Sequence, residues 1–344
     1  MQPIDIGLVL TSKNNYSMLE EFLTLYDYSK IKVLNIDAGS SYKELKTGIE
    51  LCEKNNVGFI HSENPEMQLC INQAAKYFLE QGVNWFIYSH QDAYPLTANF
   101  FDVLKNKYLS SIDPDSIGMI GFNIYHDLDD LQHWQGNETK LMTVARTPLE
   151  LGDGYYRINK TSRVNYKTFE MKPFLIEIPM WSTVLFSATS YVNHIKPDIN
   201  FQFFLSLDDV AMQYLSQNIP NIVIPELAFA HDQSLKLKHK LPYKSPILNA
   251  NEREKLYGRF DHTEVWLEKW GFRFNVYKSL LGIPVILRKV ILKIMNFFFH
   301  ANFLETLGRK DFSLVQDRYK DTLLYSFYQH DPKKGPYKYY EPEK

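Results

Sequence analysis

The sequence predicts an α/β fold in which a mostly parallel central sheet is flanked by helices and followed by a helical C-terminal extension. Through the first 125 residues, short apolar runs alternate with amphipathic stretches, a spacing typical of βαβ units. The last ninety residues have a helical pattern. Apolar residues make up 45% and charged residues 23% of the 344, so the chain can bury a large core.

Strands and helices alternate in the first part of the chain. Strands are predicted where the apolar runs are short, at 4–10, 31–36, 57–60, 84–88 and 117–122. Capping boxes that start at Ser17 and Ser41 each open a helix, a third helix covers 66–80, and Thr97 caps a fourth. Because the connections are helical crossovers, the strands are expected to run parallel.

The second part of the chain is less regular. Residues 127–173 are polar and weakly periodic, which predicts an insertion or long loops. Strands return at 175–178, 183–187 and 222–224, with a helix over 207–217. The Tyr- and Lys-rich end, 333–344, reads as a flexible tail.

Polar residues that follow the predicted strands are the candidates for chemistry, because ligands of parallel sheets bind at the carboxyl ends of the strands. Asp37 and Gly39 follow the second strand, and their turn is suited to holding a base or ribose. His90, Gln91 and Asp92 follow the fourth strand, where a carboxylate is well placed to hold a divalent cation.

Two further candidates lie later in the chain. Asp208 and Asp209 open a predicted helix, where acidic residues are favoured electrostatically and where one could act as a general base. His231 follows the apolar segment 222–225 and could complete a metal site or contact a diphosphate. Each signal alone also fits an ordinary structural role.

In order and context these motifs resemble glycosyltransferase family 2-type enzymes of GT-A fold, the nucleotide-diphospho-sugar transferase fold. The resemblance covers about 4–234, and the matching motifs, in chain order, are Thr11–Asn15, Asp37–Ser40, Asn64…Asn72, His90–Asp92, Asp208–Asp209 and His231. It implies a catalytic domain over 1–235, with acceptor-side loops about 127–173, and a helical region over 236–344. His90 stands where the family's motif more often has an acid.

The resemblance also implies the roles of individual residues. The donor-binding residues would be Thr11, Asn14, Asp37, Gly39, Asn72, His90 and Gln91. Asp92 and His231 would hold Mn²⁺ or Mg²⁺. Asp209 would be the catalytic base of an inverting displacement, with Asp208 as the alternative.

The expected function is therefore transfer of a single sugar from a nucleotide-sugar donor, with UDP-sugars favoured, to a glycan or lipid-linked acceptor hydroxyl. Synthesis of surface polysaccharide or glycoconjugate is the expected setting. A motif typical of processive polymer synthesis, Gln-x-x-Arg-Trp, is missing after the acid pair. The alternatives are a non-catalytic scaffold that binds a nucleotide or glycan and, less favoured because residues 11–15 contain no glycine, a sugar nucleotidyltransferase.

The charge and the apolar pattern of the sequence limit which partners and which cellular location are expected for the protein. A formal net charge of −2 argues against general nucleic-acid binding. The start of the chain lacks a signal-peptide pattern and the sequence has two cysteines, which favour the cytoplasm. Residues 279–304 are apolar but interrupted by Arg288, Lys289 and Lys293, so they predict either a helix packed on the domain or a homodimer partner, or a helix lying on the inner face of the membrane.

Overall fold

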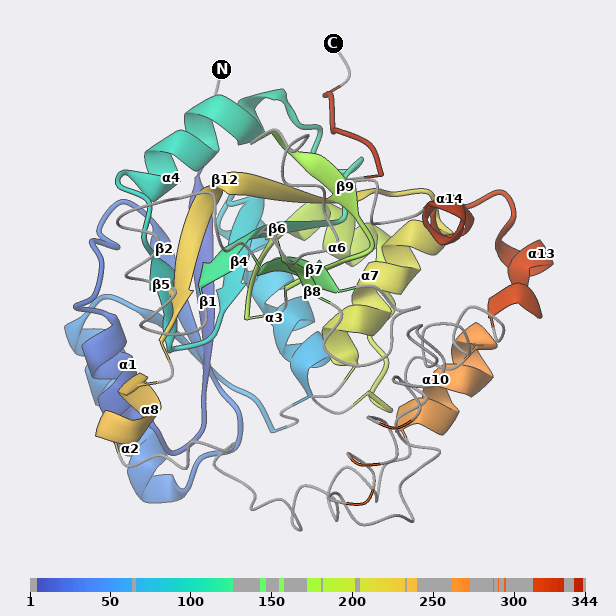
Figure 1. Cartoon of the computed structure of the whole chain (residues 1–344). Helices are drawn as coiled ribbons and strands as arrows, with labels where there is room; N and C mark the ends of the chain where they lie inside the picture. The colour runs from blue at the N-terminus through green and yellow to red at the C-terminus, as the bar shows by residue number, and fades with distance from the viewer. Residues whose placement is uncertain are drawn as a thin grey trace.

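The computed structural model describes residues 5–63, 66–125, 143–146, 155–157, 172–180, 182–201, 205–232, 234–239, 262–272, 287, 290, 294, 312–330 and 337–342. The predicted α/β class, a central sheet flanked by helices, is confirmed (Figure 1). Nearly all of the insertion predicted at 127–173 lies outside the described residues.

The first half of the fold is a parallel βαβ array. Its elements, in order, are β1 (Ile6–Ser12), α1 (Tyr16–Phe22), β2 (Lys32–Asp37), α2 (Tyr42–Lys54), β3 (Gly58–His61), α3 (Met67–Glu80) and β4 (Trp85–Ser89). All neighbouring strands in the order β4-β1-β2-β3 run parallel. The apolar strands predicted from the sequence therefore form one end of the sheet, with β3 as its edge strand.

The second half adds mostly antiparallel strands. Its elements are β5 (Ala93–Pro95), α4 (Phe100–Val103), a π-helical turn (Leu104–Tyr108), a 3-10 turn (Leu109–Ser111), β6 (Met119–Tyr125), β7 (Thr143–Arg146), β8 (Tyr155–Arg157), β9 (Phe174–Ile176), β10 (Ile178–Pro179), β11 (Thr183–Ser187), α6 (Ala188–His194), α7 (Ser206–Ser216) and β12 (Asn221–His231). The main sheet order is β10-β7-β6-β11-β4-β1-β2-β3. Among the described strands of this half, β6 and β12 pair in parallel and the other pairings are antiparallel, so the sheet as a whole is mixed.

Helices cover both faces of the sheet (Figure 1). The first two, α1 and α2, pack together on one face, whereas α3, α6 and α7 lie on the other. Helix α3 packs closely against β1 at Gly7. A Cβ at this position would come within 2.4 Å of the Phe78 ring, so the glycine allows the close approach. Between α2 and α3 the chain passes from one face of the sheet to the other. Helix α3 then connects the edge strand β3 back to β4, which lies on the other side of β1 from β2.

Strand β12 is long and bent. It changes register between Ile224 and Ala228, and Pro225 falls in this irregular stretch, where a missing backbone N–H is tolerated. The first part of β12 pairs with β9 and the last part with β5. The bend therefore brings His231, at the end of β12, beside Ala93.

Of the three predicted helix caps, Ser41 is confirmed in its N-cap position, and the other two differ from the structure. Helix α1 begins after Asn15 rather than at the box that starts at Ser17, and Ser41 stands at the N-cap of α2 without a side-chain capping bond. The Thr97 hydroxyl accepts the Ala228 N–H at 2.9 Å instead of capping α4. Tertiary contacts of these loops take the place of local capping.

The C-terminal helices pack onto the first domain. They are α8 (Ser234–Lys238), α10 (His262–Trp270), α13 (Gln316–Tyr319) and α14 (Leu323–Gln329). Trp266, Trp270 and Phe327 belong to the same apolar core as the sheet, and α14 contacts α7. Among the described residues, no helix is both long and apolar enough to cross a bilayer.

The predicted flexible tail is wrong for 337–342. The Leu175 N–H donates to the Lys338 carbonyl at 2.9 Å, and the Tyr340 N–H donates to the Pro173 carbonyl at 2.8 Å. These residues add a short bridge to β9. Backbone pairing, which the polar composition of the tail does not reveal, holds it in place.

Candidate active site

The strand order marks one place in the sheet where a ligand is expected to bind. Strand β1 lies between β2 and β4, so the connection from β1 runs to one side and the later connection to β4 runs to the other. In open α/β sheets, the crevice at the carboxyl ends of such a strand pair is where ligands bind. The loops that follow β1, β2 and β4 meet there.

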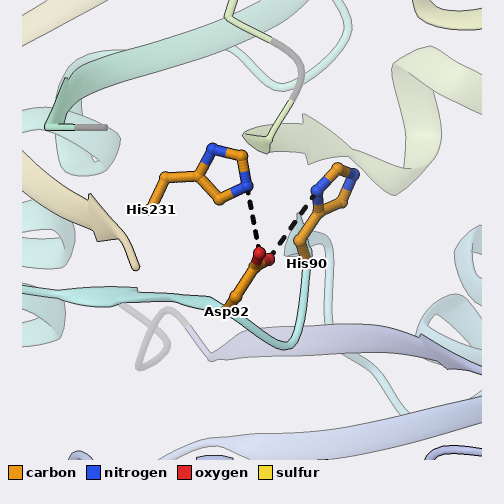
Figure 2. A group of neighbouring side chains, drawn as sticks. All are labelled: His90, Asp92 and His231. Atoms are coloured by element: carbon orange, nitrogen blue, oxygen red, sulfur yellow. Dashed lines mark ion pairs between the residues drawn. The ribbon is translucent and has the colours of Figure 1, made fainter. Parts of the chain in front are cut away.

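Three side chains from the ends of β4 and β12 converge at this edge. Figure 2 shows His90 and Asp92 on the turn after β4 and His231 at the end of β12, with their side chains directed toward one another. His231 Nε2 lies 3.3 Å from Asp92 Oδ2, and His90 Nδ1 lies 3.9 Å from Asp92 Oδ1. One potential ligand atom from each residue lies within 4.8 Å of the other two.

The backbone fixes this cluster. The Ala93 N–H donates to the His90 carbonyl at 3.0 Å and closes the turn after β4, and the His90 N–H donates to the Ser182 carbonyl at 3.0 Å. The Asp232 N–H donates to the Asp92 carbonyl at 2.7 Å, which joins the turn to the end of β12. Residues more than 130 positions apart are therefore held in one rigid arrangement.

The donor set fits a divalent cation. Two imidazoles and one carboxylate form the facial set that leaves coordination positions open for a substrate. His231 Nε2 and Asp92 Oδ2 lie 3.3 Å apart. Two neighbouring ligand atoms of one ion lie roughly 3 Å apart when the bonds to that ion are about 2.1 Å long, so the two distances are similar. The side chain of Asp92 is 1% exposed, and burying a carboxylate is costly unless a cation or donors compensate it.

Asp92 and His231, both predicted metal ligands, are thus brought together. His90, predicted to bind the donor, joins them as a third potential ligand. The sequence places His90 two residues before Asp92, so its presence on the same turn was foreseeable, whereas the contact with β12 depends on the bend of that strand.

Gln91 connects the β4 turn to the end of β1. Its amide oxygen accepts from Asn15 Nδ2 at 2.7 Å, and its amide nitrogen donates to the Ser12 hydroxyl. Ser12 in turn donates to Asn35 Oδ1 on β2. Gln91 was predicted to bind the donor, but this buried chain uses both ends of its amide, so it holds the loops in position. Ser12, Asn15 and Asn35 were not foreseen, because short polar residues near strand ends are common.

Asp37, at the end of β2, is buried and fully hydrogen-bonded. Oδ2 accepts the Tyr16 hydroxyl at 2.6 Å, and Oδ1 lies 2.8 Å from His61 Nδ1. The backbone N–H groups of Gly39 and Ser40 also donate to Oδ1, at 3.2 and 3.1 Å. Burial raises the pKa of this carboxyl, but the hydrogen bonds from Ser40, Tyr16 and His61 outweigh it and lower the pKa below its usual value.

The loops after β1 and β2 are tied together. Asn14 Oδ1 accepts the Ser41 N–H at 2.8 Å, and the Asn14 N–H donates to the Ser40 hydroxyl at 2.9 Å. Gly39 has φ +81°, a conformation that favours glycine. Asn14 and Gly39, both predicted to contact the donor, therefore shape the wall of the crevice beside Asp37.

Two of the predicted donor contacts lie apart from Asp37. Side chains alternate along a strand, so Thr11 points to the opposite face from Ser12, which is level with Asp37. Asn72 is half-buried on α3, one turn beyond Gln68 and on the same face of that helix.

Asp209 lies at the start of α7 and is completely buried. Its carboxylate accepts from Trp270 Nε1 at 2.9 Å, Gln213 Nε2 at 2.8 Å and Gln68 Nε2 at 3.1 Å, and Lys269 Nζ lies 2.9 Å away. These four donors use the four acceptor positions of a carboxylate. Burial raises the pKa of Asp209, although Lys269 and the two amides oppose the rise.

The backbone immediately before α7 is strained at Leu205. Leu205 has φ +61°, which costs a residue with a Cβ about 1–2 kcal/mol. It immediately precedes α7 and sets the direction in which that helix begins.

Asp208, also buried, is one residue before Asp209, so its side chain leaves the helix about 100° away from the contacts with Lys269 and Trp270.

Comparisons with known proteins were made by sequence and by structure. No family model and no curated protein match the sequence. Among solved structures, GalNAc-T7 with UDP, GalNAc and Mn²⁺ matches at 12% identity and a TM-score of 0.48, over 83% of this chain and 59% of that one. TarS of S. aureus (residues 1–349) matches at 13% and 0.44, over 92% and 84%.

A mannosyltransferase from Pyrobaculum calidifontis, in complex with GDP-Man and Mn²⁺, matches at 9% identity and a TM-score of 0.43, over 92% of this chain and 87% of that one. The chain spans 59% of the GalNAc-T7 structure and 46% of a longer TarS structure. At these scores the matches carry no argument about the site, which rests on the contacts described above.

Proposed function

We propose that this protein is an inverting glycosyltransferase that transfers a single sugar from a nucleotide-sugar donor. The observation that supports this most is the His90–Asp92–His231 cluster at the β1–β4 crevice, where α/β sheets bind nucleotides. The ordered motifs that resemble family 2 glycosyltransferases agree with this position. The nucleoside would lie against the ends of β1 and β2, and the diphosphate beside the cluster.

The cluster also narrows the choice of metal. Imidazole suits transition metals, whereas Mg²⁺ prefers an all-oxygen set. Two imidazoles and a single carboxylate therefore favour a transition metal over Mg²⁺, and of the two predicted ions Mn²⁺ is the transition metal. When bound, the cation would neutralise charge on the departing diphosphate.

Asp208 is the better candidate for the general base. All four acceptor positions of Asp209 are occupied by donors, so this carboxylate would have to break a buried network to take a proton. We assign proton transfer to Asp208 and the anchoring of α7 to Asp209. As the acceptor oxygen attacks the anomeric carbon, its proton passes to Asp208, and the bond from that carbon to the diphosphate oxygen breaks on the opposite face.

The acceptor is proposed to be a glycan or lipid-linked hydroxyl, as in the synthesis of a surface polysaccharide or glycoconjugate. Three described residues of the 279–304 segment support a peripheral membrane position: Leu287, Val290 and Ile294 are helical, with exposed fractions of 52%, 46% and 50%. Their spacing places them on one side of a helix. Basic residues of the same segment would meet anionic lipid on the cytoplasmic face.

A metal-removal experiment tests the function. Thermal unfolding is followed with UDP-, GDP-, dTDP- and CMP-sugars, with Mn²⁺ and after chelation. One donor at a hundredfold excess over its Kd is expected to stabilise the protein by about 2.7 kcal/mol, and only with the metal. Asp92→Asn and His231→Ala should lose this stabilisation and sugar transfer, whereas His194→Ala, which alters the partly exposed pair of His194 on α6 with Asp115, should retain both.

The alternatives predict other results. Metal-independent binding with no transfer and no donor hydrolysis would favour a non-catalytic scaffold. Formation of a nucleotide sugar from a sugar phosphate and a nucleoside triphosphate would favour a nucleotidyltransferase.

A further inference from the structure

The carboxyl ends of β1, β2 and β3 present three polar side chains in one row. Ser12 pairs in register with Asp37, and Asp37 pairs with His61. All three side chains therefore leave the same face of the sheet at the same edge. The row begins at the β1–β4 crevice and ends at the edge strand.

Asp37 is not available to a ligand. Its side chain is 0% exposed, and the Tyr16 hydroxyl, His61 and two backbone N–H groups occupy its oxygens. The strand-end carboxylate that the sequence assigns to the donor is thus used inside the protein. A neighbour in the row has to make any contact with the base.

His61 is that neighbour. Its side chain is 40% exposed, and its Nδ1 lies 2.8 Å from Asp37 Oδ1. An ionised carboxylate can only accept a hydrogen bond, so Nδ1 carries a proton and donates it. In the neutral ring Nε2 is then an acceptor, and within the described residues it makes no hydrogen bond.

We propose that His61 selects the nucleobase of the donor by accepting, at Nε2, the ring N–H that uracil and thymine carry between their two carbonyl groups. Asp37 acts as a positioning residue, because it fixes the tautomer and the orientation of the ring. Cytosine has an acceptor in place of this N–H, so it would leave two acceptors facing each other. This inference rests on the proposed nucleotide-sugar donor and adds which base it carries.

The loops beside His61 are preorganised for this contact. Hydrogen bonds of Asn14 with Ser40 and Ser41 join the turns after β1 and β2. The Tyr16 hydroxyl donates to Asp37 and holds that carboxylate in place. A ligand that enters between these two turns meets side chains that are already hydrogen-bonded to one another. Such preorganisation lowers the entropy cost of binding.

The test is calorimetric titration with UDP, dTDP, GDP and CDP in the presence of Mn²⁺. The wild type should bind UDP and dTDP more tightly than CDP by at least about tenfold, the value of one good hydrogen bond. His61→Ala should reduce UDP affinity by a similar factor and leave CDP affinity unchanged. His61→Gln, whose amide oxygen can accept, should retain part of the preference. Asp37→Asn should reduce the UDP/CDP ratio although the His61 ring is still present.

His194→Ala is the matched control, since it removes a histidine that pairs with Asp115 at 3.2 Å, away from the crevice. UDP binding with an unchanged UDP/CDP ratio in His61→Ala would overturn the role of His61 and leave the proposed function standing. Tighter binding of CDP than of UDP by the wild type would do the same. Binding of none of the four nucleotides would overturn both. Selective GDP binding that is lost in His61→Ala would keep the N–H contact but replace uracil with guanine.

Discussion

At the scale of single residues, two adjacent aspartates at the start of α7 have different surroundings. Asp209 is enclosed by Trp270, Lys269 and two glutamines, whereas the Asp208 side chain points away from them. From the sequence, Asp209 was the predicted base and Asp208 the alternative. The contacts of Asp209 are the reason for our proposal that Asp208 is the base.

Substitution by asparagine tests this separation. In Asp209→Asn, an amide NH₂ would face buried donors, so the free energy of unfolding should fall by about 1–3 kcal/mol. Asp208→Asn should remain folded but lose sugar transfer by at least a hundredfold. Urea denaturation and initial rates measure these two effects. Full transfer by Asp208→Asn, or wild-type stability of Asp209→Asn, would contradict the assignment.

The candidate site was predictable from the sequence in part. Asp92, His231 and Asp37 were identified because each follows an apolar strand, and the rule for parallel sheets says where such residues meet. The hydrogen bonds that occupy the carboxylates of Asp37 and Asp209 were not predictable, because the donors lie on other elements. These donors are Tyr16 and His61 for Asp37, and Lys269 and Trp270 for Asp209. The parallel half of the sheet followed from periodicity, whereas the antiparallel half depends on the bend in β12.

At the scale of elements, the turn after β2 shapes the crevice through Gly39. Its φ is +81°, and a Cβ there would meet nothing within 4 Å, so an alanine changes only the backbone preference. Gly82, after α3, has φ +71° and the same open surroundings, and it serves as a matched control away from the crevice.

Both Gly39→Ala and Gly82→Ala should lower the free energy of unfolding by about 1 kcal/mol, because each forces a residue with a Cβ into the left-handed region. Only Gly39→Ala should also weaken nucleotide binding, since its N–H contact with Asp37 depends on that turn. Denaturation and nucleotide titration of the two variants measure this. Equal affinities in both would show that the turn plays no part in binding.

At the scale of the whole molecule, the described C-terminal helices share the core of the first domain. Trp266, Trp270 and Phe327 pack in that core, Asn218 contacts both sides of the 321–323 turn, and 337–342 pair with β9. The sequence divides the chain near residue 235. We propose that these helices nevertheless unfold together with the sheet.

Scanning calorimetry should therefore show one transition, with calorimetric and van't Hoff enthalpies that agree. Removal of residues 312–344 should lower the midpoint of the whole transition, because it uncovers α7 and β9. Two separate transitions, with the lower one lost on truncation, would instead mean that the C-terminal region is an independent unit.

The membrane position is also a property of the whole molecule, because it decides which acceptors the crevice can reach. Flotation with vesicles is expected to recover the protein with anionic but not with neutral lipid, since basic residues contribute about 1 kcal/mol each near an anionic surface. Serine at Leu287, Val290 and Ile294 should reduce recovery at unchanged nucleotide affinity. Serine at Ile199 and Leu314, which are also exposed apolar residues, should not. Equal recovery of both variants would mean that the 287–294 face does not contact lipid, and self-association measured at the same concentrations would then show whether this face pairs two copies of the chain.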